Sequence, residues 1–466
     1  MMHRDNVALS APGKGDALNW WSTWQHRSIN RRIFAAIITV GGLTVLVKLA
    51  AAGKELVIAY RFGTTDALDA FIMAFLLPQF AIELIGGSLN GAFIPTYIHV
   101  LQHEGQAAAQ RLFSTVMASS LVLVIVAAVM LTALVTYLLP VLASGFGPEK
   151  LALTRRLYFF LLPTLLCCGF AAIWSAILNA AERFALAAVI PIITPLLTML
   201  LLLGLGTQGG IVILAIGTVL GLALEAGLLG WRLRRNGVSL LPWWYGATPA
   251  VKQVFRQYSP AVMASFLMGS TAIISQSMAA TLGPGSVSAL AYGSKATTLV
   301  LGIGSVAIST AVLPHFSRMV ALGDAAGLRH TLKTYARLIL LVTLPLAAVL
   351  IYYSEPLVRL VLQRGAFTQA DTDVVSRVQV LYLLQIPLIA VSILFVRVIS
   401  SLKASHLLLW GTVGNLILIV LFTYLFLQRF QVVGVALAIS LMHLISAAYL
   451  MYAGLRLTNM QPRSTM

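Results

Sequence analysis

Charged residues are scarce in this chain, and acidic residues are the scarcest. Only 10% of the 466 residues are charged, whereas 59% are hydrophobic. A soluble globular chain carries about 25% charged residues, so a soluble enzyme of this length would expose its apolar excess to water. Apolar runs of about 20 residues, each long enough to cross a bilayer as a helix, recur along the whole sequence. We therefore exclude a soluble fold and predict an all-α polytopic membrane protein.

Motifs for catalysis and metal binding are also missing. The two cysteines, Cys167 and Cys168, are adjacent in an apolar run, a position that suits helix packing rather than a disulfide or a metal site. The eight histidines are scattered without metal-ligand spacing. No Gly-rich loop ending in Lys-Ser or Lys-Thr occurs. The sequence thus predicts no enzyme, no cofactor, no metal and no ATP-driven pump.

The apolar runs predict about twelve membrane spans in two sets of six. They cover residues 33–59, 70–98, 112–142, 157–180, 186–205 and 211–231, and then 258–282, 287–312, 335–353, 378–402, 407–427 and 432–455. The halves echo each other, because Ala92–Pro95 closes the second span and Ala311–Pro314 closes the eighth. Parallel repeats of this kind are typical of alternating-access transporters with a site between two lobes.

The net charge of +17 sets the predicted orientation. In a soluble protein it would suggest a nucleic-acid partner, but in a membrane protein basic residues hold loops in the cytoplasm, so we expect no nucleic acid. The distribution of lysine and arginine among the loops favours a cytoplasmic position for both the N-terminus and the C-terminus. The predicted parts are a cytoplasmic segment 1–32, an N-lobe 33–232, a cytoplasmic linker 233–257, a C-lobe 258–455 and a cytoplasmic tail 456–466.

Ionisable residues at membrane depth are costly and usually face a cavity or a partner. Lys48 and Glu55 are seven residues apart and share one helix face, and Lys295 lies in an apolar, hydroxyl-rich span. Lys54 has two open interpretations, a cavity residue or a snorkelling lysine with Glu55 paired to Arg61. Further candidates for the cavity wall, some equally consistent with structural pairing, are Arg61, Glu83, Glu225, Gln276 and Arg397.

Several segments resemble one known family. They are Lys54–Phe80, Gly91–Tyr97, Gly283–Met319 and Ser354–Thr372. Their order and spacing are similar to the MurJ (MviN) family of lipid II flippases, in the multidrug/oligosaccharidyl-lipid/polysaccharide exporter superfamily. The RGAFT segment, Arg364–Thr368, is the most specific part of the resemblance.

The resemblance implies two six-helix lobes in a V around a cationic cavity. It also implies that a polyprenyl-diphosphate saccharide for cell-wall synthesis moves from the inner to the outer leaflet of the bacterial cytoplasmic membrane. Membrane lipid and cell-envelope synthases are the partners it suggests. Carried over by motif, the substrate-binding residues are Lys48, Lys54, Glu55, Asp69 and Lys295.

Some positions depart from the family pattern. All three cavity cations are lysine where the family prefers arginine, so point charges replace bidentate forks. The arginine pair of span two is replaced by the stretch 79–83, span seven has no acidic residue, and twelve spans stand where the family generally has fourteen. Lipid II and a related exopolysaccharide precursor therefore both stay open as substrates. The alternative function is an ion-coupled exporter of small amphiphilic or cationic compounds.

Overall fold

The computed structural model describes residues 29–181, 183–322, 324–402 and 404–460, and all regular structure within them is helical. The first half contains α2 (Ile29–Phe62), α3 (Asp66–Ile82), the π-helix η1 (Glu83–Gly87), α4 (Ser88–His103), α5 (Gln106–Leu142), α6 (Pro148–Leu161), α7 (Thr164–Ala180), α8 (Phe184–Val189), the short η2 (Ile190–Ile192), α9 (Ile193–Gly209) and α10 (Ile211–Arg235). The second half contains α11 (Pro249–Ala280), α12 (Ser286–Ala321), α13 (Ala325–Tyr352), α14 (Ser354–Leu362), α15 (Gln369–Leu383), α16 (Gln385–Ser401) and α17 (Ser405–Met460).

The prediction of an all-α membrane protein is confirmed. Each predicted span coincides with one helix or with consecutive helices, and nine helices of the described residues are long and apolar enough to cross a membrane. Two of the breaks within spans fall at proline, at Pro163 between α6 and α7 and at Pro191 in η2.

The element α17 is a hairpin of two helices that holds the last two predicted spans. The backbone leaves helical geometry at Gln431, with φ 48°. The two arms run antiparallel, because the Asn415 amide donates to the Ser446 hydroxyl at 3.1 Å and the Tyr449 hydroxyl donates to the Leu407 carbonyl at 3.0 Å.

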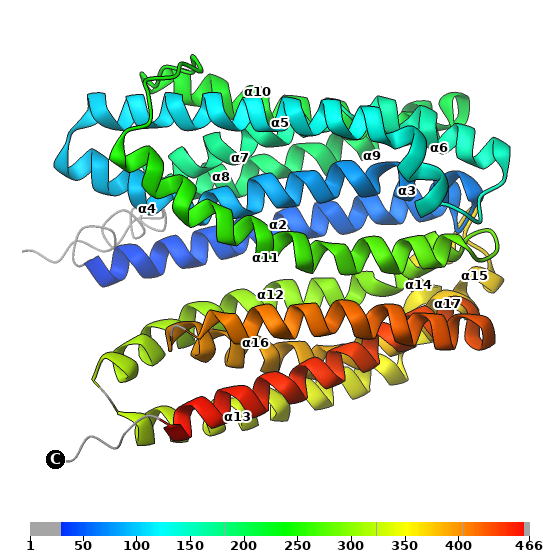
Figure 1. The fold of residues 1–466 in the computed structure, drawn as a ribbon. Helices are drawn as coiled ribbons and strands as arrows, with labels where there is room; N and C mark the ends of the chain where they lie inside the picture. Colours follow the sequence, from blue (N-terminus) through cyan, green and yellow to red (C-terminus); the bar gives the residue numbers. More distant parts are fainter. Residues whose placement is uncertain (1–28, 182, 323, 403, 461–466) are drawn as a thin grey trace, which may run out of the picture.

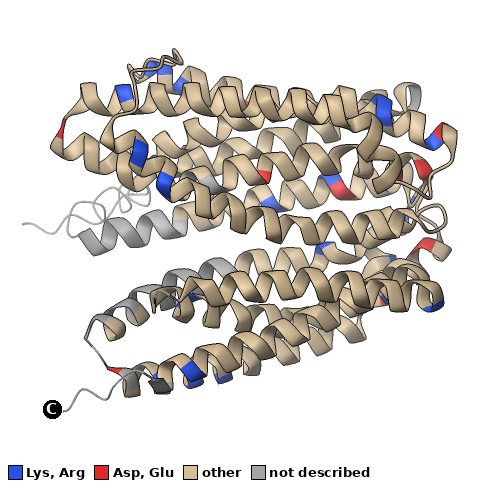
Figure 2. Cartoon of the chain, viewed as in Figure 1, with Lys and Arg blue, Asp and Glu red and all other residues tan. Residues whose placement is uncertain are grey.

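The two halves diverge from one end of the bundle to the other (Figure 1). We call the end that contains Gly63 and Gly285 the joined end, and the end that contains Arg235 and Met460 the open end. Helix α11 packs against α4, α5 and η1 of the first half as well as against α17. Charged residues lie mainly toward the ends of the helices (Figure 2).

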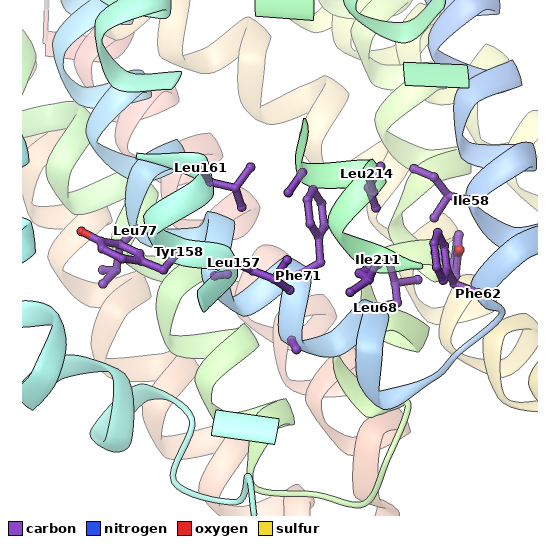
Figure 3. Packing of buried hydrophobic residues seen from close by; sticks show 14 of the residues in the cluster. Ile58, Phe62, Leu68, Phe71, Leu77, Leu157, Tyr158, Leu161, Ile211 and Leu214 are labelled. Atoms are coloured by element: carbon purple, nitrogen blue, oxygen red, sulfur yellow. The ribbon is translucent and has the colours of Figure 1, made fainter. Parts of the chain in front are cut away.

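The hydrophobic cores explain why the halves, apart from helix α11, meet at the joined end. At the joined end, one core combines Phe71 and Leu157 of the first half with Tyr292 and Phe367 of the second. Figure 3 shows the first-half members of this core packed together. At the open end, each half has its own core among the described residues, apart from the start of α11, which packs with the first half. Shared apolar burial therefore stabilises contact at the joined end.

Candidate functional site

A cavity of about 350 Å³ lies between the two halves. Its wall is formed by α2, α3, η1 and α10 of the first half and by α11 and α12 of the second. The polar and charged residues that line it are Lys54, Glu55, Gln79, Glu83, Thr218, Gln276, Ser288, Tyr292, Ser294 and Lys295. A concave site with a few convergent polar groups among apolar ones is the usual form of a small-ligand site.

Three of these residues form an ion-pair cluster that links the two halves. Glu55 Oε1 on α2 lies 3.5 Å from Lys54 Nζ and 3.2 Å from Lys295 Nζ on α12. The lysine side chains keep 25% and 49% of their surface exposed, so both ammonium groups remain accessible from the cavity. Lys295 reaches the cavity because Ser288, Tyr292 and Lys295 recur at helical spacing on one face of α12. We call Lys54, Glu55 and Lys295 the ionic cluster.

The charge balance of the wall differs from the cationic cavity that the resemblance implies. The ionisable lining residues are two lysines and two glutamates, Lys54, Lys295, Glu55 and Glu83. Glu83 accepts a hydrogen bond from the Gln79 amide at 3.0 Å. The formal charges of these four side chains sum to zero at neutral pH. The cavity wall therefore carries both positive and negative groups and has no net positive charge.

The structure brings together five of the candidates that the sequence suggested: Lys54, Glu55, Glu83, Gln276 and Lys295. It does not place the other five in the wall. Lys48 is exposed on α2, on the same face as Glu55 and about 10 Å nearer the open end. Arg397 lies on α16, within the second half.

Arg61 and Glu225 make contacts inside the first half instead of facing the cavity. The Arg61 guanidinium donates to the Leu203 carbonyl of α9 at 3.1 Å, so the alternative pairing of Arg61 with Glu55 is not formed. Glu225 is buried and accepts a hydrogen bond from the Thr194 backbone N–H at 3.2 Å, where α9 begins after the break at η2. A carboxylate is favourable at such a helix N-terminus.

Asp69 lies behind the cavity at the joined end, where it connects the halves. Its side chain is fully buried, and its two oxygens accept hydrogen bonds from the backbone N–H groups of Gly285 and Ser288, each at 2.8 Å. These groups belong to the start of α12, so the carboxylate of one half caps a helix of the other. Lys150 Nζ lies 2.9 Å from Asp69 and also pairs with Asp66. The sequence pattern gave no sign of the Lys150 contact, which joins α6 to α3.

The segments that carry the family resemblance meet at the joined end. The Ala366 N–H donates to the Tyr60 carbonyl at 2.8 Å, and the Thr64 hydroxyl donates to the Asp371 carboxylate. Gly63 has φ 53°, and a Cβ at this position would collide with the Ala366 backbone. Backbone of the first half therefore lies directly against backbone of the RGAFT segment.

A cavity between two helical halves that are in contact at one end and have separate cores at the other is the arrangement of an alternating-access membrane transporter. The sequence agrees, because a family model described as Lipid II flippase MurJ matches residues 58–465. The chain therefore belongs to the MurJ lipid II flippase family, which consists of transporters of the bacterial inner membrane rather than enzymes.

Individual relatives agree with this family, and solved structures show the same fold. The probable lipid II flippase MurJ of Rhizobium meliloti is 28% identical over 362 residues, which are 75% of this chain and 67% of that protein. The one of Synechocystis is 28% identical over 432 residues, 87% of this chain and 78% of that protein. A structure of lipid II flippase MurJ in an inward closed conformation has a TM-score of 0.76 at 21% identity, covering 91% of this chain and 90% of that chain. An inward-facing multidrug resistance MATE family transporter has a TM-score of 0.72 at 16% identity, covering 92% and 99%.

Proposed function

We propose that this chain moves a polyprenyl-diphosphate saccharide, lipid II or a related cell-wall or exopolysaccharide precursor, from the inner to the outer leaflet. The observation that carries the proposal is the ionic cluster, which puts the ammonium groups of one half-buried and one exposed lysine, from different halves, within 3.5 Å of one carboxylate. A diphosphate bears more negative charge than Glu55 and competes with it for both lysines through charge-assisted hydrogen bonds. Lys48, on the same face of α2 and about 10 Å nearer the open end, is a further cation for a head group that enters from the open end.

The open end is proposed to face the cytoplasm, with both termini on that side, and the two lobes to rock about the cavity. In the described state the two halves are in contact at the joined end, so substrate is proposed to enter the cavity from the open end. Release requires the contacts of Asp69 with α12 to break and the open end to close. Envelope synthases that consume the saccharide outside, or the membrane potential at ~2.3 kcal/mol per charge per 100 mV, supply the driving force.

The test is flipping of fluorescent lipid II by the purified chain in proteoliposomes, with protection of the label from an external quencher as the readout. Lys295→Ala should abolish flipping, Lys295→Arg should keep much of it, and Lys295→Glu should be worse than alanine because the wall then repels the anion. Lys333→Ala, an exposed lysine on α13 outside the cavity, is the matched control. A well-folded Lys295→Ala protein with normal flipping would remove the ionic cluster from the mechanism.

The alternative function is tested in the same vesicles. An exporter of small cationic compounds should move a cationic dye, and removing Lys295 should not impair that movement. Dye transport without lipid flipping would therefore favour the exporter.

A further inference from the structure

The linker between α10 and α11, residues 236–248, is fixed against the first half at the open end. The Gln110 side chain on α5 donates to the Ser239 carbonyl of the linker at 2.8 Å. The Tyr245 N–H of the linker donates to the Thr115 hydroxyl on α5 at 3.3 Å. Figure 1 shows the linker crossing the start of α5 before α11 begins. The linker is therefore a fixed part of the outer surface of the first half.

The linker presents large apolar side chains outward. More than half of the side-chain surface is exposed at each of Leu241, Trp243, Trp244 and Tyr245. Four such side chains within five residues are unfavourable in water, whereas tryptophan and tyrosine are enriched where a bilayer meets water. We call Leu241–Tyr245 the aromatic segment. It lies at the starts of α5 and α11, two apolar helices that bury little of their surface within the chain, and therefore where the membrane meets water.

An apolar groove of about 370 Å³ begins beside the aromatic segment and lies between α5 and α11. Its α5 side runs from Val116 to Val126, and its α11 side includes Phe255. Tyr245 marks the open-end limit of the groove, because its N–H is bonded to Thr115, the residue before Val116. Val126 and Phe255 are exposed along the groove. The groove therefore faces the surrounding lipid and starts at the level of the interface.

Two basic residues flank the open-end limit of the groove. Arg111 lies one turn before Thr115 on α5, Lys252 lies one turn before Phe255 on α11, and both are exposed. The stretches that contain them, residues 105–148 and 226–323, have no acidic residue. An anionic group at this end of the groove therefore meets two cations and no carboxylate of α5, the linker or α11.

We propose that the groove and the aromatic segment bind an anionic phospholipid of the leaflet at the open end. An acyl chain lies in the groove, the phosphate lies between Arg111 and Lys252, and the rings of the aromatic segment lie at the level of the head groups. Charge complementarity beside an apolar groove selects this ligand, because a phospholipid joins one anionic group to long apolar chains. The site lies outside the cavity, so the inference goes beyond the proposed function.

The test titrates the purified chain with phosphatidylglycerol and with phosphatidylcholine of the same acyl chains, and native mass spectrometry gives each Kd. Phosphatidylglycerol should bind more tightly. Lys252→Gln should weaken its binding about fivefold, the contribution of one basic residue near an anionic lipid surface, and leave phosphatidylcholine nearly unchanged. Ser119→Phe fills the groove and should weaken both lipids, and Val122→Phe serves if that variant does not fold. Lys333→Gln, an exposed lysine on α13 of the second half, is the matched control and should change neither.

Equal affinity for the two lipids, or equal effects of Lys252→Gln and Lys333→Gln, would overturn the proposal. A spin label at Leu241, introduced after Cys167 and Cys168 are changed to serine, tests the position of the aromatic segment in a bilayer. The label should collide more with oxygen than with a water-soluble nickel chelate. A label that reads as in water would also overturn the lipid site and would favour a protein partner for the exposed rings. Neither measurement uses flipping, so a failure here leaves the proposed function untouched.

Discussion

Replacing Asp69 by asparagine should release the joined end. The two Asp69 oxygens accept from Gly285 N and Ser288 N at 2.8 Å, and Lys150 Nζ lies 2.9 Å away. An amide has one oxygen, so one of the two N–H groups loses its acceptor and Lys150 loses one of its two charge partners. A lost hydrogen bond to a charged group costs about 1.5–3 kcal/mol, and the lost charge at the α12 N-terminus about 0.5–1 kcal/mol more.

This cost falls only on the state with a shut joined end, because the contacts are broken when that end opens. The sum of roughly 2–4 kcal/mol shifts the ratio of the two states by about 30-fold to 700-fold toward opening. We would measure it by electron-spin distance distributions between labels on Glu149 and Asp373, two exposed positions of opposite halves near the joined end. The labels are introduced as cysteines after Cys167 and Cys168 are changed to serine.

The matched control is Asp66→Asn. Asp66 pairs with Lys150 as well, but its side chain is 54% exposed and its contact does not cross between the halves. Exposed ion pairs contribute about 0–1 kcal/mol, so the distance distribution should hardly move. If Asp69→Asn leaves the distribution as in the wild type, or if Asp66→Asn shifts it equally, then capping of α12 does not hold the joined end shut.

Three further outcomes follow from other contacts. Gly63→Ala should shift the same distance distribution toward an open joined end, because the new Cβ would collide with the Ala366 backbone and the φ of 53° at position 63 disfavours alanine. A distribution equal to that of the wild type would contradict this close approach. Tyr258→Phe removes the hydrogen bond to the Ile85 carbonyl of η1, so the free energy of local opening that hydrogen exchange measures in η1 should fall by about 0.5–1.5 kcal/mol. Unchanged exchange rates in η1 would mean that this hydrogen bond does not stabilise it. A reporter fused after Arg456 should read cytoplasmic and one inserted at Arg364 external; an external reading at Arg456 would refute the orientation.

Membrane spans were predictable because the bilayer imposes one length on every crossing helix. The sequence could also select Lys54, Glu55 and Lys295, since charges at membrane depth are rare and have to face something polar. What it could not provide was the partner across the molecule. In the sequence, Asp69 is an acidic residue near the start of a span, a position that is also consistent with a cavity residue. Only the fold shows that its carboxylate contacts the first turn of α12.

Glu225 illustrates the same limit. Its depth in the membrane was consistent with the cavity wall and equally with a structural partner, because a helical period tells only which residues share a face and not which neighbour that face meets. The break at η2 frees the Thr194 N–H, and Glu225 accepts from it inside the first half. The π-helix at Glu83 was likewise absent from the sequence reasoning, because no composition or spacing signal separates it from a regular helix.

The position of Glu55 has a consequence for the half of the cycle in which nothing is carried. A flippase that has delivered its lipid has to return empty, and two bare ammonium groups in a cavity sealed from water are costly. Glu55 lies between Lys54 and Lys295, at 3.5 Å and 3.2 Å, and supplies a resident counter-charge. Glu55 therefore balances one of the two ammonium charges in the unloaded protein, which lowers the cost of the empty return and weakens binding of chloride or free phosphate at this site.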